Sequence, residues 1–315
     1  RHLVEIIIAL WTVKAVTNAL LESSWISVVA EAIPPKRRAA VNGTRWTLLS
    51  VVMAISGVGF GTLLENVPFP LNYQIVFLIS FLGGAAGMVF WDRIRIPENV
   101  RAEATRTART PLKMRVRAYW RNLQVPAFLR YVLTMNVLRL ALNLPIALYS
   151  IYWIRTLDAT DLVIGWRNTS FQVALIVGYY LWGRVVSRKG HFVPLLICSI
   201  GAGLTPVLTA FIPGPLWLPV IAIVEGFFLT GINLAMFDTL LEVCPAERRP
   251  SFVAVNTMLA SLMIFLGPMI GSALADLLAI RGVFFIAAGV HVVAMLLFWR
   301  YRVGACEPDS VEEFR

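Results

Sequence analysis

The sequence predicts an all-α membrane protein, a polytopic helical bundle with about nine transmembrane helices, and its composition and apolar runs lead to this fold class. Of the 315 residues, 58% are hydrophobic and 15% are charged, whereas a soluble domain carries about 25% charged residues. Uncharged runs such as residues 73–90 and 193–224 reach the roughly 18 residues that a helix needs to cross a hydrocarbon core of ~30 Å. Lipid offers backbone amides no hydrogen-bond partner, so these runs must be helical.

The apolar runs define nine predicted spans. The fifth is expected to begin near Leu162, because residues 171–183 alone are too short to cross a bilayer. Prolines such as Pro34, Pro68, Pro213 and Pro245 mark the connections between spans. The spans are residues 3–30, 44–64, 73–91, 129–153, 171–183, 193–212, 216–241, 252–274 and 283–299.

The distribution of lysine and arginine predicts the orientation of the spans. With the loop after the first span in the cytoplasm, cytoplasmic segments hold 22 of the 28 Lys and Arg residues, and outside segments hold 4. The outside residues are Arg1, Arg155, Arg167 and Arg281. Because membrane proteins concentrate positive charge on the cytoplasmic side, we expect a multi-pass protein of the plasma or inner membrane with a cytoplasmic C-terminus. The same bias accounts for the net charge of +10, so no nucleic-acid partner is expected.

This orientation puts the first residue outside and the last residue inside. Residue 1 is Arg rather than Met, and no signal peptide precedes the first span. We therefore expect an odd number of spans upstream of Arg1, and we interpret the sequence as a fragment.

A loop motif occurs twice, and each copy precedes a span with glycines four residues apart. Gly57 and Gly61 lie in the second span, and Gly267 and Gly271 lie in the eighth. Small residues at this spacing let helices approach closely. The motif copies are Glu31-Ala-Ile-Pro34-Pro-Lys-Arg37 and Glu242-Val-Cys-Pro245-Ala-Glu-Arg248.

The repeat pairs the first three spans with the last three, so spans four to six have no counterparts. Three helices would then be missing before Arg1, which agrees with the odd number that the orientation requires. The predicted regions are residues 1–92 with three helices of an N-terminal bundle, a basic cytoplasmic linker at 93–128, a six-helix C-terminal bundle at 129–303, and a tail at 304–315.

The linker has helical periodicity. Arg109, Lys113 and Arg117 recur every four residues opposite an apolar stripe. This pattern predicts a basic amphipathic helix at the cytoplasmic membrane interface. A merely solvated connector is the alternative.

Two homologous halves joined by a basic linker resemble the major facilitator superfamily, with this chain read as helices four to twelve of an expected twelve. The resemblance implies a secondary active transporter, not an enzyme, that moves a small-molecule solute across the lipid bilayer by alternating access, as a monomer. The alternative is a non-transporting receptor or assembly protein on the same fold. No cofactor is expected, and coupling to a proton or another ion is left open. A fragment of nine helices is expected not to transport by itself, because its cavity lacks one wall.

A local motif after the fifth span carries part of this resemblance. The family pattern is Gly, three residues, Asp, a basic residue, one residue, Gly and further basic residues. Gly183, Arg188 and Gly190 match this pattern, while Ser187 replaces the aspartate and His191 replaces an arginine. The resemblance implies a gating contact at the cytoplasmic helix ends. The alternative is an ordinary basic loop on the cytoplasmic side.

Polar and charged residues inside the spans are the candidates for a substrate path, since such residues are costly in a membrane. Lys14 and Glu225 are 211 residues apart, so a cation and an anion occupy equivalent positions of the repeat. Pro145 is expected to loosen the fourth span. The resemblance implies that the first, fourth and seventh spans line the central cavity. The cavity candidates are Lys14, Asn18, Glu22, Asn136, Arg139, Asn143, Glu225 and Asn233.

Two interpretations of these residues stay open. Lys14, Arg139 and Glu225 either contact substrate or relay protons, or Lys14 pairs with Glu22 or Glu225 only to neutralise a buried charge. Metal and enzyme chemistry find no support in the sequence, because His2, His191 and His291 are dispersed and the three cysteines form no metal-binding pattern. The sequence also lacks a phosphate-binding Walker loop, which excludes an ATP-driven pump from the expectations.

Overall fold

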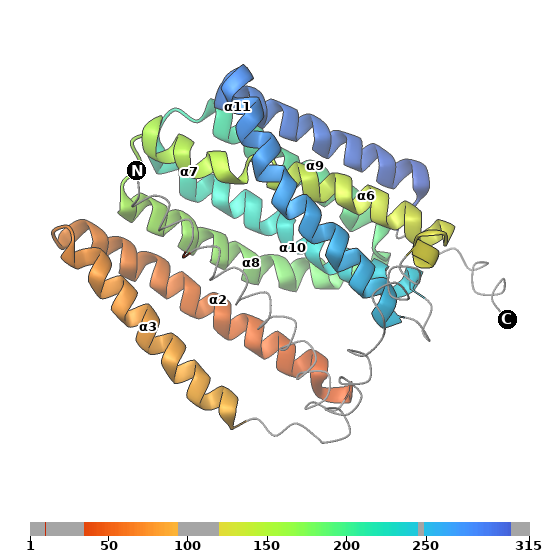
Figure 1. The fold of residues 1–315 in the computed structure, drawn as a ribbon, viewed down its shortest axis with the longest axis horizontal. Coiled ribbons are helices and arrows are strands. Elements are labelled where there is room, and N and C mark those ends of the chain that lie inside the picture. The colour runs from red at the N-terminus through yellow and green to blue at the C-terminus, as the bar shows by residue number, and fades with distance from the viewer. Residues whose placement is uncertain (1–9, 11–34, 94–119, 245–248, 304–315) are drawn as a thin grey trace. The chain divides into compact units, whose positions relative to one another are not determined.

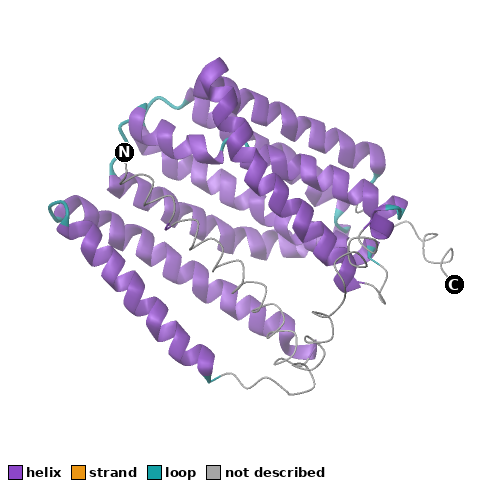
Figure 2. Cartoon of the chain, in the orientation of Figure 1, coloured by secondary structure: helices purple, strands orange, loops and turns teal. Residues whose placement is uncertain are grey.

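The structure is a computed structural model that describes residues 10, 35–93, 120–244 and 249–303. Within these ranges the chain consists of helices and short loops, without a strand (Figure 2). The predicted first span, most of the predicted linker with its amphipathic helix, and the predicted tail lie outside the described residues.

Helices cover the predicted spans from the second onward, although the fourth span is divided between two helices and the last two spans lie in one (Figure 1). The helix of the fifth predicted span, α8, begins at Asp161, next to the expected start at Leu162. The number of nine spans is not confirmed, since six described segments are long and apolar enough to cross a membrane. The described helices are α2 (Pro35–Asn66), α3 (Leu71–Asp92), α6 (Pro126–Asn143), α7 (Ile146–Arg155), α8 (Asp161–Lys189), α9 (Phe192–Phe211), the short 3-10 helix η1 (Pro215–Trp217), α10 (Leu218–Val243) and α11 (Arg249–Tyr301).

Two compact units make up the chain. One contains Arg1–Leu48 and Gln74–Pro111, and the other contains Leu49–Tyr73 and Leu112–Arg315. In the first unit, α3 exposes large apolar side chains such as Phe77, Phe81 and Phe90, which is the surface expected of a helix in lipid. All contacts described below lie in the second unit.

The helices differ from the predicted spans at two places: the fourth span is divided, and the eighth and ninth spans are joined. The predicted span 129–153 is two helices, because α6 ends at Asn143 and α7 begins after Pro145. Proline has no N–H and its ring clashes with the preceding turn, so the expected loosening at Pro145 is confirmed. The last two predicted spans are both contained in α11, which is interrupted at Ala279, where φ is 60° and ψ is 164°.

Aromatic side chains fill the core between these helices. Phe128 of α6 packs edge-on against Phe252 of α11, with ring centroids 4.7 Å apart. A second cluster contains Tyr149 of α7 and Phe284 of α11, whose rings stack at 5.1 Å. These clusters fix α6 and α7 against α11.

Glycine lets α2 and α8 cross closely. A Cβ atom added at Gly57 would lie 3.0 Å from the Gly165 carbonyl oxygen and 2.7 Å from Thr169 Oγ1. The Thr169 hydroxyl donates to the Ala54 carbonyl over 2.6 Å. At the other predicted pair, an added Cβ at Gly267 would lie 2.7 Å from Asn143 Cβ. The prediction that these glycines permit close helix packing is confirmed.

Candidate functional site

An ion pair between α8 and α10 is the centre of the candidate site. The Arg167 guanidinium donates from Nη2 to Oε2 of Glu225. Both side chains are largely buried, with 12% of Arg167 and 26% of Glu225 exposed. A lone charge in a membrane helix is costly, so each residue compensates the other.

Arg167 was counted among the outside residues, although the expected start near Leu162 puts it within the fifth predicted helix. It lies in the second turn of α8, because this helix begins at Asp161. Thr160 caps the helix by accepting a hydrogen bond from the Val163 amide at 3.4 Å, and Asp161 occupies the first turn. Thr and Asp are favoured at such helix starts, which agrees with the expected start near Leu162.

Aromatic rings hold the Arg167 guanidinium in position. Its Cζ atom lies 4.5 Å from the Trp153 ring centroid and 5.4 Å from that of Phe171. Cations within about 6 Å of a ring face are attracted to it. The Arg167 Nη1 group also donates to Asn168 Oδ1 at 3.2 Å.

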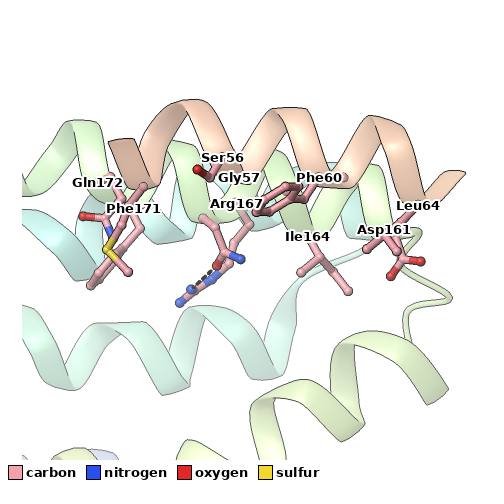
Figure 3. A pocket seen from close by; sticks show the side chains of 13 residues that line it. Ser56, Gly57, Phe60, Leu64, Asp161, Ile164, Arg167, Phe171 and Gln172 are labelled. Carbon is pink, nitrogen blue, oxygen red and sulfur yellow. Dashed lines mark hydrogen bonds between the residues drawn. The ribbon is translucent and has the colours of Figure 1, made fainter. Parts of the chain in front are cut away.

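One cavity adjoins Arg167, between α2 and α8, and is called the α2–α8 cavity. Its volume is about 470 Å³, within the roughly 300–1,000 Å³ range of small-molecule sites. Figure 3 shows the side chains of both helices that surround it. The residues that line it are Met53, Ser56, Gly57, Phe60, Gly61, Leu64, Asp161, Ile164, Gly165, Arg167, Asn168, Phe171 and Gln172.

A second cavity adjoins Glu225 and is called the bundle cavity, because its walls come from α6, α7, α9, α10 and α11. Its volume is about 230 Å³, and Asn143 and Tyr149 are among its lining residues. His291, which is 2% exposed, and Thr205 also line it. Among the described residues, His291 Nδ1 and Thr205 Oγ1 have no hydrogen-bond partner. The Arg167–Glu225 pair therefore joins two cavities, one at each residue.

Arg139, another predicted cavity residue, has a different environment. It is 9% exposed and donates to Asn256 Oδ1 at 3.1 Å and to the Met236 sulfur at 3.3 Å. Among the described residues, no carboxylate lies within ion-pair distance of it. Arg139 thus joins α6 to α10 and α11 through neutral groups, and Asn256 and Met236 were missed by the sequence analysis.

The predicted asparagines contact their own helices or a neighbour. Asn136 donates to the Val132 carbonyl at 2.7 Å, and Asn143 donates to the Arg139 carbonyl at 2.8 Å. Asn233 lies beside the Tyr179 side chain of α8. The remaining candidates Lys14, Asn18 and Glu22 lie outside the described residues.

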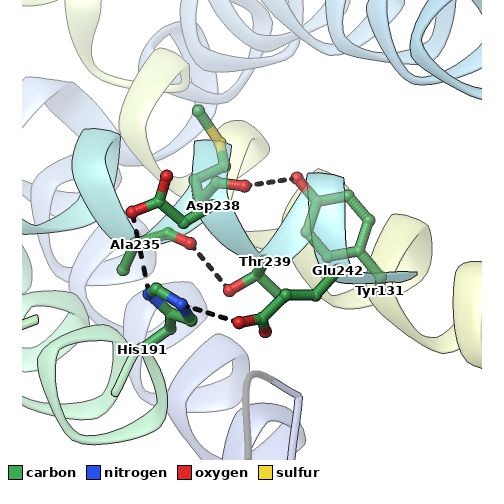
Figure 4. A network of polar contacts seen from close by, with 7 residues as sticks. Tyr131, His191, Ala235, Asp238, Thr239 and Glu242 are labelled. Carbon is green, nitrogen blue, oxygen red and sulfur yellow. Dashed lines mark hydrogen bonds and ion pairs between the residues drawn. The ribbon is translucent and has the colours of Figure 1, made fainter. Parts of the chain in front are cut away.

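The predicted gating motif meets the second repeat motif at the end of α10 (Figure 4). Gly190, with a φ of 72°, ends α8. His191 Nε2 lies 2.9 Å from Glu242 Oε1, and its Nδ1 lies 3.9 Å from Asp238 Oδ2. A glycine is suited to this positive φ, and it directs His191 towards the two carboxylates.

The other motif residues take no described part in this contact. A Cβ atom added at Gly183 would have no neighbouring atom within 4 Å. Arg188 is exposed in the last turn of α8. Only the backbone is described for Ser187 and Arg37. Glu31, Pro34, Pro245 and Arg248 lie outside the described residues. In the described part of the chain, His, Cys, Asp and Glu form no group of three that could hold a metal ion.

Comparison with known families matches the Major Facilitator Superfamily over residues 131–313, which is more than half of the chain. The chain belongs to this superfamily. The match begins within α6 and covers every helix from α7 to α11, so it includes the Arg167–Glu225 pair and the residues that line the bundle cavity.

Curated relatives of this superfamily member share short, diverged stretches with it. The multidrug resistance protein MdtG of Proteus mirabilis is 28% identical over 139 residues, covering 42% of this chain and 33% of that protein. The MFS efflux transporter aclA of Aspergillus oryzae is 25% identical over 206 residues, covering 62% and 35%. The chain thus matches about a third of the length of these relatives.

Solved structures of transporters have a similar fold. A bacterial homologue of the iron transporter ferroportin, in an inward-facing state, superimposes with a TM-score of 0.62 at 16% identity, covering 86% of this chain and 65% of that one. A bacterial metal transporter gives a TM-score of 0.60, also at 16% identity, covering 86% and 67%. At this identity the likeness concerns the fold alone.

Proposed function

We propose that the protein is a secondary active transporter that moves a small-molecule solute across the membrane by alternating access. The observation that carries the proposal is the Arg167–Glu225 ion pair between two cavities. Charged residues inside membrane helices are expensive, and they mark substrate and ion pathways. Membership of this superfamily and relatives named as a multidrug resistance protein and as an efflux transporter support the same conclusion.

The ion pair lies within the C-terminal bundle, between α8 and α10, next to the crossing of α8 with α2 of the N-terminal bundle. Alternating access requires contacts that exist in one state and are exchanged in another. Arg167 belongs to α8, which also packs on α2 through the Gly57 crossing, and Glu225 belongs to α10. A solute or a proton that changes this pair acts directly on the packing of α8 against α10.

The proposal includes the membrane and the assembly state. The chain acts as a monomer in the plasma or inner membrane, with its C-terminus in the cytoplasm and without a nucleic-acid partner. Transport needs no resident cofactor and is coupled to a proton or another ion. A receptor or assembly protein on the same fold is less well supported. Such a protein would be expected to have its cavity filled by bulky aromatic side chains, whereas here the aromatic side chains line both cavities without filling them.

Reconstitution tests the proposal. The complete protein in liposomes is exposed to a mixed pool of labelled metabolites under an imposed proton gradient, and internal solutes are identified by mass spectrometry. We expect one or a few solutes to accumulate with wild type and to stay at the protein-free level with Glu225→Ala. Equal internal solutes in wild-type and protein-free liposomes, with the protein correctly inserted, would contradict transport.

A further inference from the structure

We propose that Arg167 binds the carboxylate of a small organic anion with an apolar, planar body in the α2–α8 cavity, and that Glu225 takes up a proton when the anion displaces it. The anion and the proton then bind together. Describing this anion as a substrate rests on the proposed function, whereas its binding can be measured without transport.

Arg167 has donors to spare for such a ligand. Its guanidinium carries five N–H donors, and the described hydrogen bonds use one on Nη1 and one on Nη2. A guanidinium matches the two oxygens of a carboxylate side by side. Trp153 and Phe171 hold the group in one orientation, so little freedom is lost when a ligand binds.

The charge expected of the ligand follows from which residue of the ion pair lines which cavity. Arg167 lines the larger α2–α8 cavity, and Glu225 lines the bundle cavity instead. A ligand that enters the larger cavity therefore meets the cation of the pair. Asp161, the other charged residue of its lining, is at the first turn of α8 and disfavours a second anionic group there.

The rest of the lining determines the body of the ligand. Phe60 and Phe171 provide aromatic faces, and Met53, Leu64 and Ile164 provide aliphatic ones. Ser56, Asn168 and Gln172 add a small number of polar groups. An apolar wall with few polar groups is typical of sites for small, largely apolar molecules.

Displaced Glu225 is neutralised by a proton because a carboxylate without a partner is costly inside a membrane. The groups around it are Arg167 of α8, Asn143 of α6, Tyr149 of α7 and His291 of α11. The new O–H needs an acceptor, and the bundle cavity offers His291 Nδ1 and Thr205 Oγ1, both without a described partner.

Charge balance links the two events. Before binding, the pair consists of one cation and one anion. After binding, Arg167 pairs with the ligand carboxylate and Glu225 is a neutral acid, so the net charge within the helices is unchanged. Binding of the anion without the proton would leave one uncompensated negative charge, which the membrane disfavours.

Equilibrium binding to the complete protein in lipid nanodiscs tests the inference with three probes of the same shape. They are 2-naphthoate, the uncharged 2-naphthamide and the cationic 2-naphthylmethylammonium. We expect wild type to bind 2-naphthoate in preference, with an affinity that rises as pH falls, by up to about tenfold per pH unit for one linked proton. Glu225→Gln is expected to bind 2-naphthoate at least as tightly as wild type and independently of pH.

Removal of the cation is expected to abolish the preference. Because Arg167→Gln alone leaves Glu225 unpaired and could impair folding, the double variant Arg167→Gln/Glu225→Gln removes both charges. It is expected to bind 2-naphthoate about 10- to 100-fold more weakly, the value of a charged hydrogen bond. Arg155→Gln, at an exposed position of α7, is the matched control and is expected to bind as wild type.

Several results would overturn the inference: equal binding of the three probes, full binding by the double variant, or wild-type binding that does not change with pH. Failure of the transport proposal is distinguishable. If 2-naphthoate binds as expected but is not accumulated by liposomes, the inference holds and transport fails. If another solute is transported and 2-naphthoate binding does not depend on Arg167, transport holds and the inference fails.

Discussion

Two buried arginines of the same bundle are stabilised in opposite ways. Arg167 pairs with the Glu225 carboxylate, lies between aromatic rings and lines a cavity of about 470 Å³. Arg139 is bound by the Asn256 amide oxygen and the Met236 sulfur, and it lines neither of the two cavities described above.

The difference separates a charge that can be exchanged from one that is fixed. An ion pair beside a cavity can be opened by a competing ion, because the competitor replaces the partner that is lost. The neutral partners of Arg139, by contrast, hold it in a packed interface. The transport proposal therefore rests on the Arg167–Glu225 pair and not on Arg139.

The largest expected effect comes from breaking the ion pair on one side. Glu225→Leu leaves Arg167 without its partner, and loss of one member of a buried pair costs about 3–5 kcal/mol. The free energy of unfolding in detergent measures this loss. The double variant Arg167→Gln/Glu225→Gln should recover most of it, and equal stability of the single and double variants would contradict the pairing.

Loss of the neutral partner of Arg139 should cost less. Asn256→Ala removes one hydrogen bond to a charged group, so we expect about 1.5–3 kcal/mol of destabilisation with unchanged binding of 2-naphthoate. The control is Met258→Ala, at an exposed position of the same helix. Weakened 2-naphthoate binding in Asn256→Ala would show that the two arginines are not independent.

The helix crossing beside Arg167 gives a smaller and separate effect. Gly57→Val would press a side chain against Thr169, and overpacking typically costs about 1–3 kcal/mol. Gly59→Val makes the same change where an added Cβ meets nothing within 4 Å. Thermal unfolding of both variants measures the cost of the crossing, and equal stability would mean that α2 and α8 do not pack there.

The smallest expected effect is at the end of α10, where the third charged contact is partly exposed. Glu242 is 43% exposed beside His191, and such pairs are worth about 0–1 kcal/mol. His191→Ala should therefore lower the free energy of unfolding by less than Glu225→Leu or Asn256→Ala does. Lys189→Ala is the control. A loss comparable to that of Glu225→Leu would refute the distinction between buried and exposed charges.

Apolar runs predicted the helices from α2 onward because the bilayer requires their length and composition. Pro145 predicted the break in the fourth span for an equally local reason, the missing N–H of proline. The break at Ala279 was expected only as an unspecified connection, since no residue there signals a positive φ.

The partners of the buried charges could not be predicted in the same way. The expected start near Leu162 placed Arg167 in a helix, but its pairing with Glu225, 58 residues away, depends on packing. Asn256 is 117 residues from Arg139, and only packing brings them together. His191 and Glu242 were found as parts of separate motifs, and their contact also depends on packing.

The break at Pro145 divides one membrane crossing into two segments with different polar contacts. Arg139 ties α6 to α10 and α11, while α7 carries Trp153 to the guanidinium of Arg167. The helical backbone hydrogen bonds are interrupted at residues 144 and 145. At this point Gly271 of α11, which has no side chain, packs directly against the backbone of Leu144. Both segments pack on α11, α6 through Phe128 and α7 through Tyr149, so the ion pair and the core around Arg139 are linked by side-chain packing rather than by a continuous helix.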